Sequence, residues 1–259
     1  KKFLRLKRAQ DVIEAIAWGT VLAVTVMFLV DGGLKGIHDV PSALNALSRL
    51  TALVGTDLLL IHMLLIARVP WIDKFYGHDR ATLAHKKLGK PVLYFVVAHF
   101  LASLISFAIT DGKNVIDEMV NLFVNVPDMW TATIGLALMI AVVITSLNFA
   151  RRKMSYEAWY LVHIMSYISV LAAVPHQFST GSDIHGKPVQ TIFWVSLYFF
   201  VLFNLAWYRV LSPMLRGWKL GLQVQSVRQE SSDSVSIYLE GKNVSKLGGD
   251  IQTRNNGSL

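Results

Sequence analysis

The sequence predicts an all-α membrane protein, a bundle of six transmembrane helices. Three observations support this fold class. Hydrophobic residues make up 53% of the 259-residue chain and charged residues only 16%, with a mean hydropathy of +0.45, which is unlike a soluble domain. Several apolar stretches are long enough to cross a hydrocarbon core of about 30 Å. Four histidines fall as two evenly spaced pairs inside two of these stretches.

The apolar stretches begin close to the N-terminus, directly after the basic segment KKFLRLKR. This first stretch is too long for a signal peptide, and no small-residue cleavage site precedes Asp31, so we interpret it as a transmembrane helix. The second stretch is short, and its core TDLLLIHMLLIA carries only Asp57 and His62 as ionisable residues. We expect the six spans at about 12–31, 50–68, 88–110, 129–149, 157–175 and 189–211.

Loop charges predict the orientation of the bundle. Lys and Arg number 17 in the N-terminal segment and in the loops after the second, fourth and sixth stretches, against 4 in the other loops. By the positive-inside rule, both termini are expected in the cytoplasm of a multi-pass protein of the cell (plasma) membrane, in contact with lipid. The pI of about 9.7 therefore reflects topology, and we expect no nucleic-acid partner. The absence of cysteine excludes disulfides and Cys-ligated metal centres within the chain.

The long outer connection at 111–128 carries Val115, Met119, Phe123 and Val124 at helical spacing. This pattern predicts a short helix that either lies flat on the outer membrane surface or packs as a lid over the end of the bundle. The residues leave both alternatives open.

The pattern changes after Trp218, where LQVQSVRQESSDSVSIYLEG reads as strand, polar turn and strand. A two-stranded hairpin is marginal alone, so it is expected to begin a cytoplasmic β-domain whose remainder is missing from this chain. The missing initiator Met also suggests a fragment. We divide the chain into a cytoplasmic N-terminal segment (1–11), a six-helix transmembrane domain (12–215), the first strands of the β-domain (216–240), and a disordered or artificial tail (241–259).

The four histidines carry the strongest functional signal. His85 and His99 are 14 residues apart, and His163 and His176 are 13 apart, so each pair spans roughly 20 Å of helix. Their two helices run in the same direction, so His85 and His163 are expected at the cytoplasmic level and His99 and His176 at the outer level. Imidazole is a good iron ligand, and the pattern predicts two stacked b-type haems, inner and outer, each with both axial positions filled by histidine. No catalytic residue is assigned.

The 13-residue separation of His163 and His176 does not place both side chains on one face of a straight helix. Fourteen residues leave two side chains about 40° apart around a helix, whereas thirteen leave them about 140° apart. Pro175, directly before His176, is expected to supply the irregularity that turns His176 inward, and Pro91 to kink the other helix.

Other residues near these levels have weaker signals. We expect His62 to be hydrogen-bonded within the bundle, and His185 to be a surface residue. Gln177 is a candidate for hydrogen bonds to outer haem propionates. Three aromatic side chains lie between the two haem levels and are candidates for filling the gap between the porphyrins, namely Tyr94, Phe95 and Tyr167. Basic residues near the inner level are candidates for neutralising propionates, without a single assignment: Arg80, Lys86, Lys87, Lys90 and Arg152.

The sequence resembles a bacterial-type member of the ferric reductase-like transmembrane family, which includes NADPH oxidases and ferric-chelate reductases. The resemblance covers about residues 12–240. It rests on ARVPWIDKFYGHDRATLAHKKLGK, the H-x13-H and H-x12-H pairs, HQFSTGSDI after the fifth stretch, and QSVRQESSDSVSIYLEG.

The resemblance implies a haem-containing oxidoreductase that passes electrons from cytoplasmic NAD(P)H through FAD and two haem b groups to an extracellular acceptor, oxygen (with superoxide production) or ferric iron. In that family a β-barrel after the sixth helix binds FAD, so 216–240 would be its first strands. The chain departs from the pattern, because it carries neither an R-x-Y-[ST] flavin motif nor a Gly-rich nicotinamide motif. A flavin dehydrogenase portion, in cis or in trans, is therefore expected to supply the electrons.

Two other functions compete with this interpretation. A quinol- or ascorbate-linked di-haem cytochrome b also places two histidine pairs on two helices, without a flavoprotein domain. A proton or ion transporter would use Asp57, His62 and the four histidines as a relay.

Overall fold

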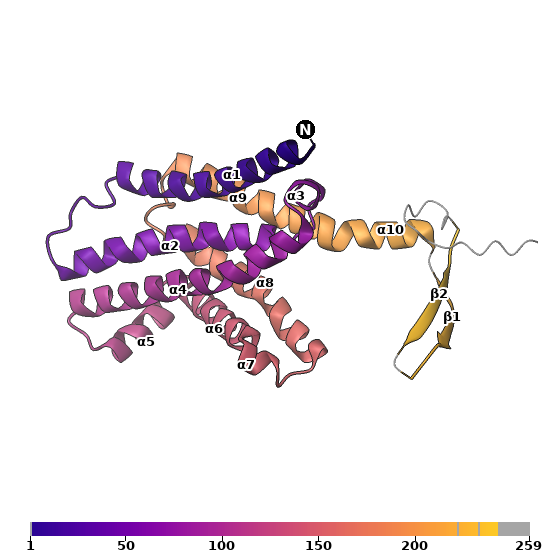
Figure 1. Cartoon of the computed structure of the whole chain (residues 1–259). Coiled ribbons are helices and arrows are strands. Elements are labelled where there is room, and N and C mark those ends of the chain that lie inside the picture. Colours follow the sequence, from indigo (N-terminus) through magenta and orange to yellow (C-terminus); the bar gives the residue numbers. More distant parts are fainter. Residues whose placement is uncertain (1, 222, 233, 243–259) are drawn as a thin grey trace, which may run out of the picture.

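The computed structural model describes residues 2–221, 223–232 and 234–242 and is a helical bundle that continues into a long helix and a hairpin (Figure 1). Its elements are α1 (Lys2–Val30), α2 (Val40–Leu64), α3 (Pro70–Phe75), α4 (His78–Thr110), α5 (Val115–Asn125), α6 (Met129–Ser146), α7 (Asn148–Arg151), α8 (Tyr156–Ser179), α9 (Pro188–Leu205), the π-helical turn η1 (Ala206–Leu211), α10 (Ser212–Leu220), β1 (Gln223–Gln229) and β2 (Val235–Glu240).

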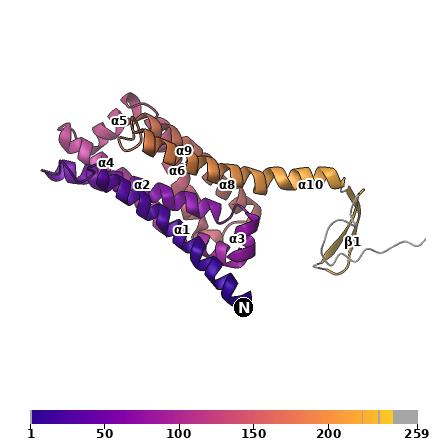
Figure 2. The ribbon, with the colours of Figure 1, turned by 90° about the horizontal axis from the view of Figure 1, so that it is seen from above.

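Among the described residues, six helical segments are long and apolar enough to cross a membrane, which confirms the predicted number of spans in a multi-pass protein. Figure 2 shows α1 along one flank of the bundle and α9 running on into α10 beyond it. The candidate spans are Lys7–Val30, Val40–Leu64, His78–Thr110, Met129–Ser146, Tyr156–Ser179 and Pro188–Leu220.

The second span begins at Val40, ten residues before the predicted start. Asp39 accepts a hydrogen bond from the backbone N–H of Ser42, and the Ser42 hydroxyl accepts one from the N–H of Asp39, which forms a capping box. Pro41 occupies the first turn, where its missing N–H costs nothing. Asn45, Ser48 and Arg49 lower the mean hydropathy of the first half of this helix, so the predicted apolar stretch did not include it.

The third and sixth spans are also longer than predicted. Lys86, Lys87 and Lys90 were expected in a loop, but they are exposed residues of α4, because this helix already begins at His78. The sixth span passes through η1 into α10 and ends at Gly221, whose left-handed backbone (φ 55°) closes the helix.

The bundle is built on two close helix pairs, α2 with α4 and α6 with α8. A glycine lies at each contact. A Cβ on Gly55 of α2 would lie 2.9 Å from Cβ of Phe95, and a Cβ on Gly135 of α6 would lie 2.7 Å from the carbonyl oxygen of Ser169. The Ser169 hydroxyl also donates to the Gly135 carbonyl at 2.6 Å. Small residues thus let these membrane helices approach closely.

The predicted helix in the connection at 111–128 is present as α5, with Asn114 accepting from the N–H groups of Ile116 and Asp117 at its start. Its apolar side chains are exposed and do not pack over the bundle, so the structure favours the surface alternative over the lid.

The predicted strand–turn–strand segment forms an antiparallel hairpin in which Val227 pairs with Ile237 and a bulge interrupts the register between Val224 and Ser226. It lies beyond α10, away from the bundle, and its strand residues are largely exposed (Figure 1). Most of the tail predicted at 241–259 lies outside the described residues, which end at Lys242.

We expect the replacement Gly135→Leu to lower the free energy of unfolding by about 1–3 kcal/mol, because the added side chain forces α6 away from α8. Denaturant titration in mixed micelles measures this. Gly19→Leu is the matched control, because a Cβ on Gly19 meets nothing within 4 Å, and this variant should unfold like the parent protein. Equal stability of the two variants would contradict the close α6–α8 contact.

Candidate functional site

The structure brings His85 of α4 and His163 of α8 together at one end of the bundle. Their ring centroids are 6.1 Å apart and the ring planes make an angle of 69°. We call this the His85 end; α2 finishes here, and α4 and α8 begin here.

The separation of these two rings fits two imidazoles on opposite sides of one metal ion. Metal–imidazole bonds are about 2 Å long and a ring nitrogen lies about 1 Å from the ring centre, so two such centroids lie about 6 Å apart. Two imidazoles fill only the axial positions of an octahedral iron, and a tetrapyrrole supplies the other four donors. The donor set of this pair therefore fits a haem.

A backbone carbonyl holds the ring of His85. Its Nδ1 lies 3.0 Å from the carbonyl oxygen of His62. This carbonyl belongs to the last turn of α2, and Ile66 donates its N–H to Met63 instead, so the His62 oxygen is left for the imidazole. Because a carbonyl only accepts, Nδ1 carries the proton and Nε2 is the nitrogen with a free lone pair.

His99, further along α4, is held in a similar way. Its Nδ1 lies 3.1 Å from the carbonyl oxygen of Ser48 and 2.9 Å from the Ser48 hydroxyl, which itself donates to the His99 carbonyl at 3.2 Å. Ser48 is buried, with 2% of its surface exposed. The Nε2 of His99 is again the nitrogen left for a metal, as is usual when a ligating histidine donates its other N–H to the protein.

His163 is oriented by side chains. The Ser146 hydroxyl lies 3.3 Å from its Nδ1 and also accepts from Nε1 of Trp159. The Trp159 ring stacks on the imidazole with centroids 4.9 Å apart, and the guanidinium of Arg151 covers this indole at 4.8 Å.

His176 is the least constrained of the four. α8 continues through Pro175 to Ser179, so His176 lies on the helix itself. Its buried Nδ1 has no hydrogen-bond partner in the part of the chain that the structure describes. The structure does not bring His99 and His176 together as it does His85 and His163, since no stacking or edge contact of their rings occurs among the described residues.

Two residues of α2 support the α4 histidines, namely Ser48, which the sequence did not single out, and His62, for which it predicted no such role. Ser48 and His62 are 14 residues apart, the same separation as His85 and His99, and Gly55 lies halfway between them. Because α2 and α4 run antiparallel, Ser48 meets His99 while His62 meets His85. The repeated spacing was visible in the sequence, but the pairing of the two helices was not.

His62 differs from its prediction. It was expected to be hydrogen-bonded within the bundle, but its Nδ1 is buried without a hydrogen-bond partner among the described residues, whereas its backbone carbonyl accepts from His85. Its ring lies flat on that of His85, with centroids 3.7 Å apart and an angle of 16°.

The aromatic residues expected between the two levels do not share one role. Tyr94 is 65% exposed and points away from the bundle, so its predicted place in the gap is wrong. Phe95 packs against Gly55 in the α2–α4 contact, and Tyr167 packs at the edge of the core. The side-chain oxygen of Gln177 accepts from the hydroxyl of Tyr198 at 2.8 Å.

Among the basic residues, Arg80 donates to Gln10, and Lys86 and Lys87 are exposed. Arg209 lies on η1, and its positive charge acts on His85 and His163. In the sequence, Arg209 counted only as one of the positive loop charges. Its guanidinium donates to the carbonyl of Ile66 at 3.3 Å. The signal that could have identified it is its place at the end of the sixth span.

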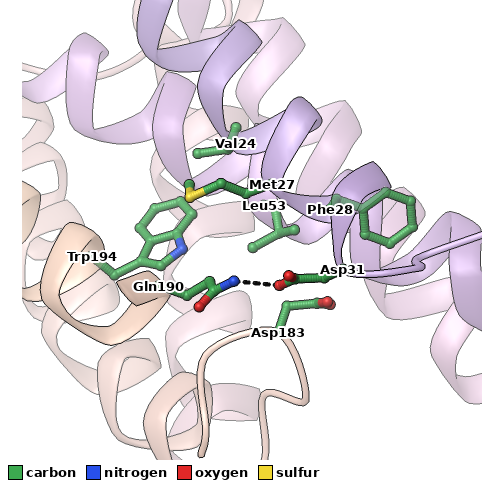
Figure 3. Close-up of a pocket in the computed structure, with 8 residues that line it drawn as sticks. All are labelled: Val24, Met27, Phe28, Asp31, Leu53, Asp183, Gln190 and Trp194. Atoms are coloured by element: carbon green, nitrogen blue, oxygen red, sulfur yellow. Dashed lines mark hydrogen bonds between the residues drawn. The ribbon is translucent and has the colours of Figure 1, made fainter. Parts of the chain in front are cut away.

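The opposite end of the bundle, the His99 end, is closed by charged residues. Arg49 of α2 donates two hydrogen bonds to Asp183, and Lys187 lies 3.2 Å from Asp31 and 3.5 Å from Asp183. Gln190 also donates to Asp31, beside a water-sized cavity of about 10 Å³ (Figure 3). This network joins α1, α2, α9 and the connection at 180–187. His185 is exposed there and caps the carbonyl of Phe178, as expected of a surface residue.

A bundle with six candidate membrane-spanning helices, in which His85 and His163 meet across two helices, defines the class: a multi-pass helical membrane protein. Residues 51–174, just under half of the chain, match the family model described as "Ferric reductase like transmembrane component", which confirms the predicted resemblance over this segment. The match implies transmembrane electron transfer by an oxidoreductase. The matched segment contains His85, His99 and His163 and ends two residues before His176. No curated protein and no solved structure matches the chain.

Proposed function

We propose that this protein carries electrons across the cell membrane through two bis-histidine haem b sites. His85 and His163 form the inner site, and His99 and His176 the outer site. The observation that carries the proposal is the 6.1 Å separation of the His85 and His163 rings, with the Nδ1 of His85 held on a backbone carbonyl.

In this proposal each histidine binds iron through Nε2. The Nδ1 contacts of His85, His99 and His163 select that nitrogen and fix the ring planes. A haem with both axial positions filled supplies a one-electron carrier at its edge and leaves no open position for a substrate on iron. Both α4 imidazoles are half-buried beside the apolar contact between α2 and α4.

The inner site is proposed to receive electrons from a flavin dehydrogenase portion that oxidises cytoplasmic NAD(P)H with FAD, in cis or in trans. The hairpin supports this direction, because it follows α10 on the side of the His85 end (Figure 1). A flavin-binding barrel that began with β1 and β2 would lie next to the inner pair. The positive loop charges support a cytoplasmic position for this end and for both termini.

The outer site is proposed to pass electrons to an extracellular acceptor, oxygen or ferric iron. Its two histidines lie toward the end closed by Arg49, Asp183 and Lys187. Since iron in the outer site would have no open position, the acceptor is reduced at the haem edge or beyond it.

We expect His99→Leu and His176→Leu to remove the outer haem and spare at least part of the inner one. His85→Leu and His163→Leu should stop electrons entering the chain. Haem content per protein and the dithionite-reduced Soret band measure this. His185→Leu is the control, because His185 is exposed and should leave both haems in place.

Two outcomes would contradict the proposal. Two haems per protein in all four ligand variants would show that the assigned histidines are wrong, and a parent protein without a reducible Soret band would point to transport. Reduction of both haems by a quinol, with no flavoprotein present, would instead favour a quinol-linked cytochrome b.

A further inference from the structure

The rings of His62 and His85 are in direct contact between α2 and α4. The two imidazoles lie face to face, 3.7 Å apart and within 16° of parallel. Gly89, one turn after His85, lies beside the His62 ring, and a Cβ there would make an ordinary van der Waals contact with Cε1 of His62 at 3.6 Å.

His62 therefore constrains His85 in two independent ways. Its carbonyl at 3.0 Å fixes where Nδ1 points, and its ring blocks rotation of the imidazole about the bond to Cβ. The end of α2 adds a third influence, because the last carbonyls of a helix carry partial negative charge. Hydrogen bonding to the outer nitrogen of a histidine ligand raises its electron-donating strength, which is one determinant of a haem potential.

The outer histidine of α4 has a different environment. Ser48 offers His99 a carbonyl and a hydroxyl from the middle of α2, without a stacked ring and far from the helix end. The two α4 histidines are thus held by the same helix but with different groups.

We propose that His62 is a positioning residue that fixes the ring plane of His85 and distinguishes the inner site from the outer one. This inference rests on the proposed function, in which His85 is an axial ligand.

The test compares His62→Ala, which removes the stacked ring, with His62→Phe, which retains it. Both variants keep the backbone carbonyl. Haem content, the low-spin ferric EPR signals and the two midpoint potentials are measured in the full chain in nanodiscs. We expect His62→Ala to broaden the inner EPR signal and shift the inner midpoint while the outer one stays, and His62→Phe to restore a narrow inner signal. The matched variant Ser48→Ala should shift only the outer midpoint.

Unchanged inner signals and potentials in His62→Ala would overturn the proposal. Loss of the inner haem in His62→Ala but not in His62→Phe would support it, whereas loss in both variants would make His62 a ligand itself and overturn it. Failure of the proposed function has a separate signature, because the parent protein would then lack two low-spin haems.

A second, independent observation concerns α5. Its apolar side chains recur as neighbouring pairs every four residues, so that they share one face of the helix, and they are 44–70% exposed. They are Val115, Ile116, Met119, Val120, Phe123 and Val124.

The other sides of α5 face different surroundings. Glu118 is only 1% exposed, lies 3.2 Å from Nζ of Lys113 and accepts a hydrogen bond from Asn121 at 3.0 Å. Asp117 and Asn125 are exposed. The helix thus has an apolar face, a polar exposed face and a buried acidic residue between them.

The occupant of the apolar face follows from its neighbours. α5 connects the ends of α4 and α6, two candidate membrane-spanning helices that themselves expose Ile105, Ile109 and Trp130. Interfacial helices combine an apolar face in the acyl boundary with a polar face in water. We infer that α5 lies in the headgroup layer of the leaflet at the His99 end, with this face in lipid.

The chain contains no cysteine, so single spin labels need no background substitutions. We expect a nitroxide on Val120→Cys, in phosphatidylcholine nanodiscs, to collide more often with oxygen than with a water-soluble nickel complex. On the matched Asp117→Cys variant the order should reverse. A label at 120 as exposed to nickel as the one at 117 would overturn the inference, and one shielded from both reagents would indicate a protein partner instead.

Discussion

The arrangement of this protein depends on one interaction, the antiparallel pairing of α2 with α4. It brings the backbone oxygens of Ser48 and His62 to the Nδ1 atoms of His99 and His85. A backbone acceptor cannot change its protonation state or rotate away, so it orients an imidazole more rigidly than a side chain does. Gly55 allows the pairing, because a larger residue there would meet Phe95.

The second histidine helix, α8, is supported differently. Its partner α6 approaches closely at Gly135, but it holds His163 through the Ser146 hydroxyl and the stacked Trp159. His176 has no comparable support for its Nδ1 among the described residues. The groups that hold Nδ1 therefore differ among the four proposed ligands. Backbone carbonyls hold it in the two α4 histidines and a hydroxyl holds it in His163, whereas in His176 it has no hydrogen-bond partner among the described residues.

The two ends of the bundle differ in character. At the His99 end, Arg49, Asp183 and Lys187 form ion pairs among themselves and with Asp31, which ties four elements together. At the His85 end, α10 leaves the bundle and leads to an exposed hairpin (Figure 1). One end is thus closed by its own charges, whereas the other carries α10 and the hairpin. This difference supports the proposed entry of electrons at the His85 end.

The sequence by itself determined the number of spans and the spacing of the histidines. Both depend on local quantities, namely the length of apolar runs and the rise of a helix. It misplaced the start of α2, because polar residues that face the bundle interior, such as Ser48, lower the hydropathy of a helix without ending it. It also placed Tyr94 inward, because spacing alone does not say which side of a helix faces its partner.

Only the tertiary structure decided which α2 carbonyl meets which α4 imidazole, why His62 lies on His85, and that the apolar face of α5 points away from the bundle. The contacts between α2 and α4 join residues that are 23 and 51 positions apart in the chain. The register between packed helices is set by the sum of their side-chain contacts, which no local pattern in the sequence contains.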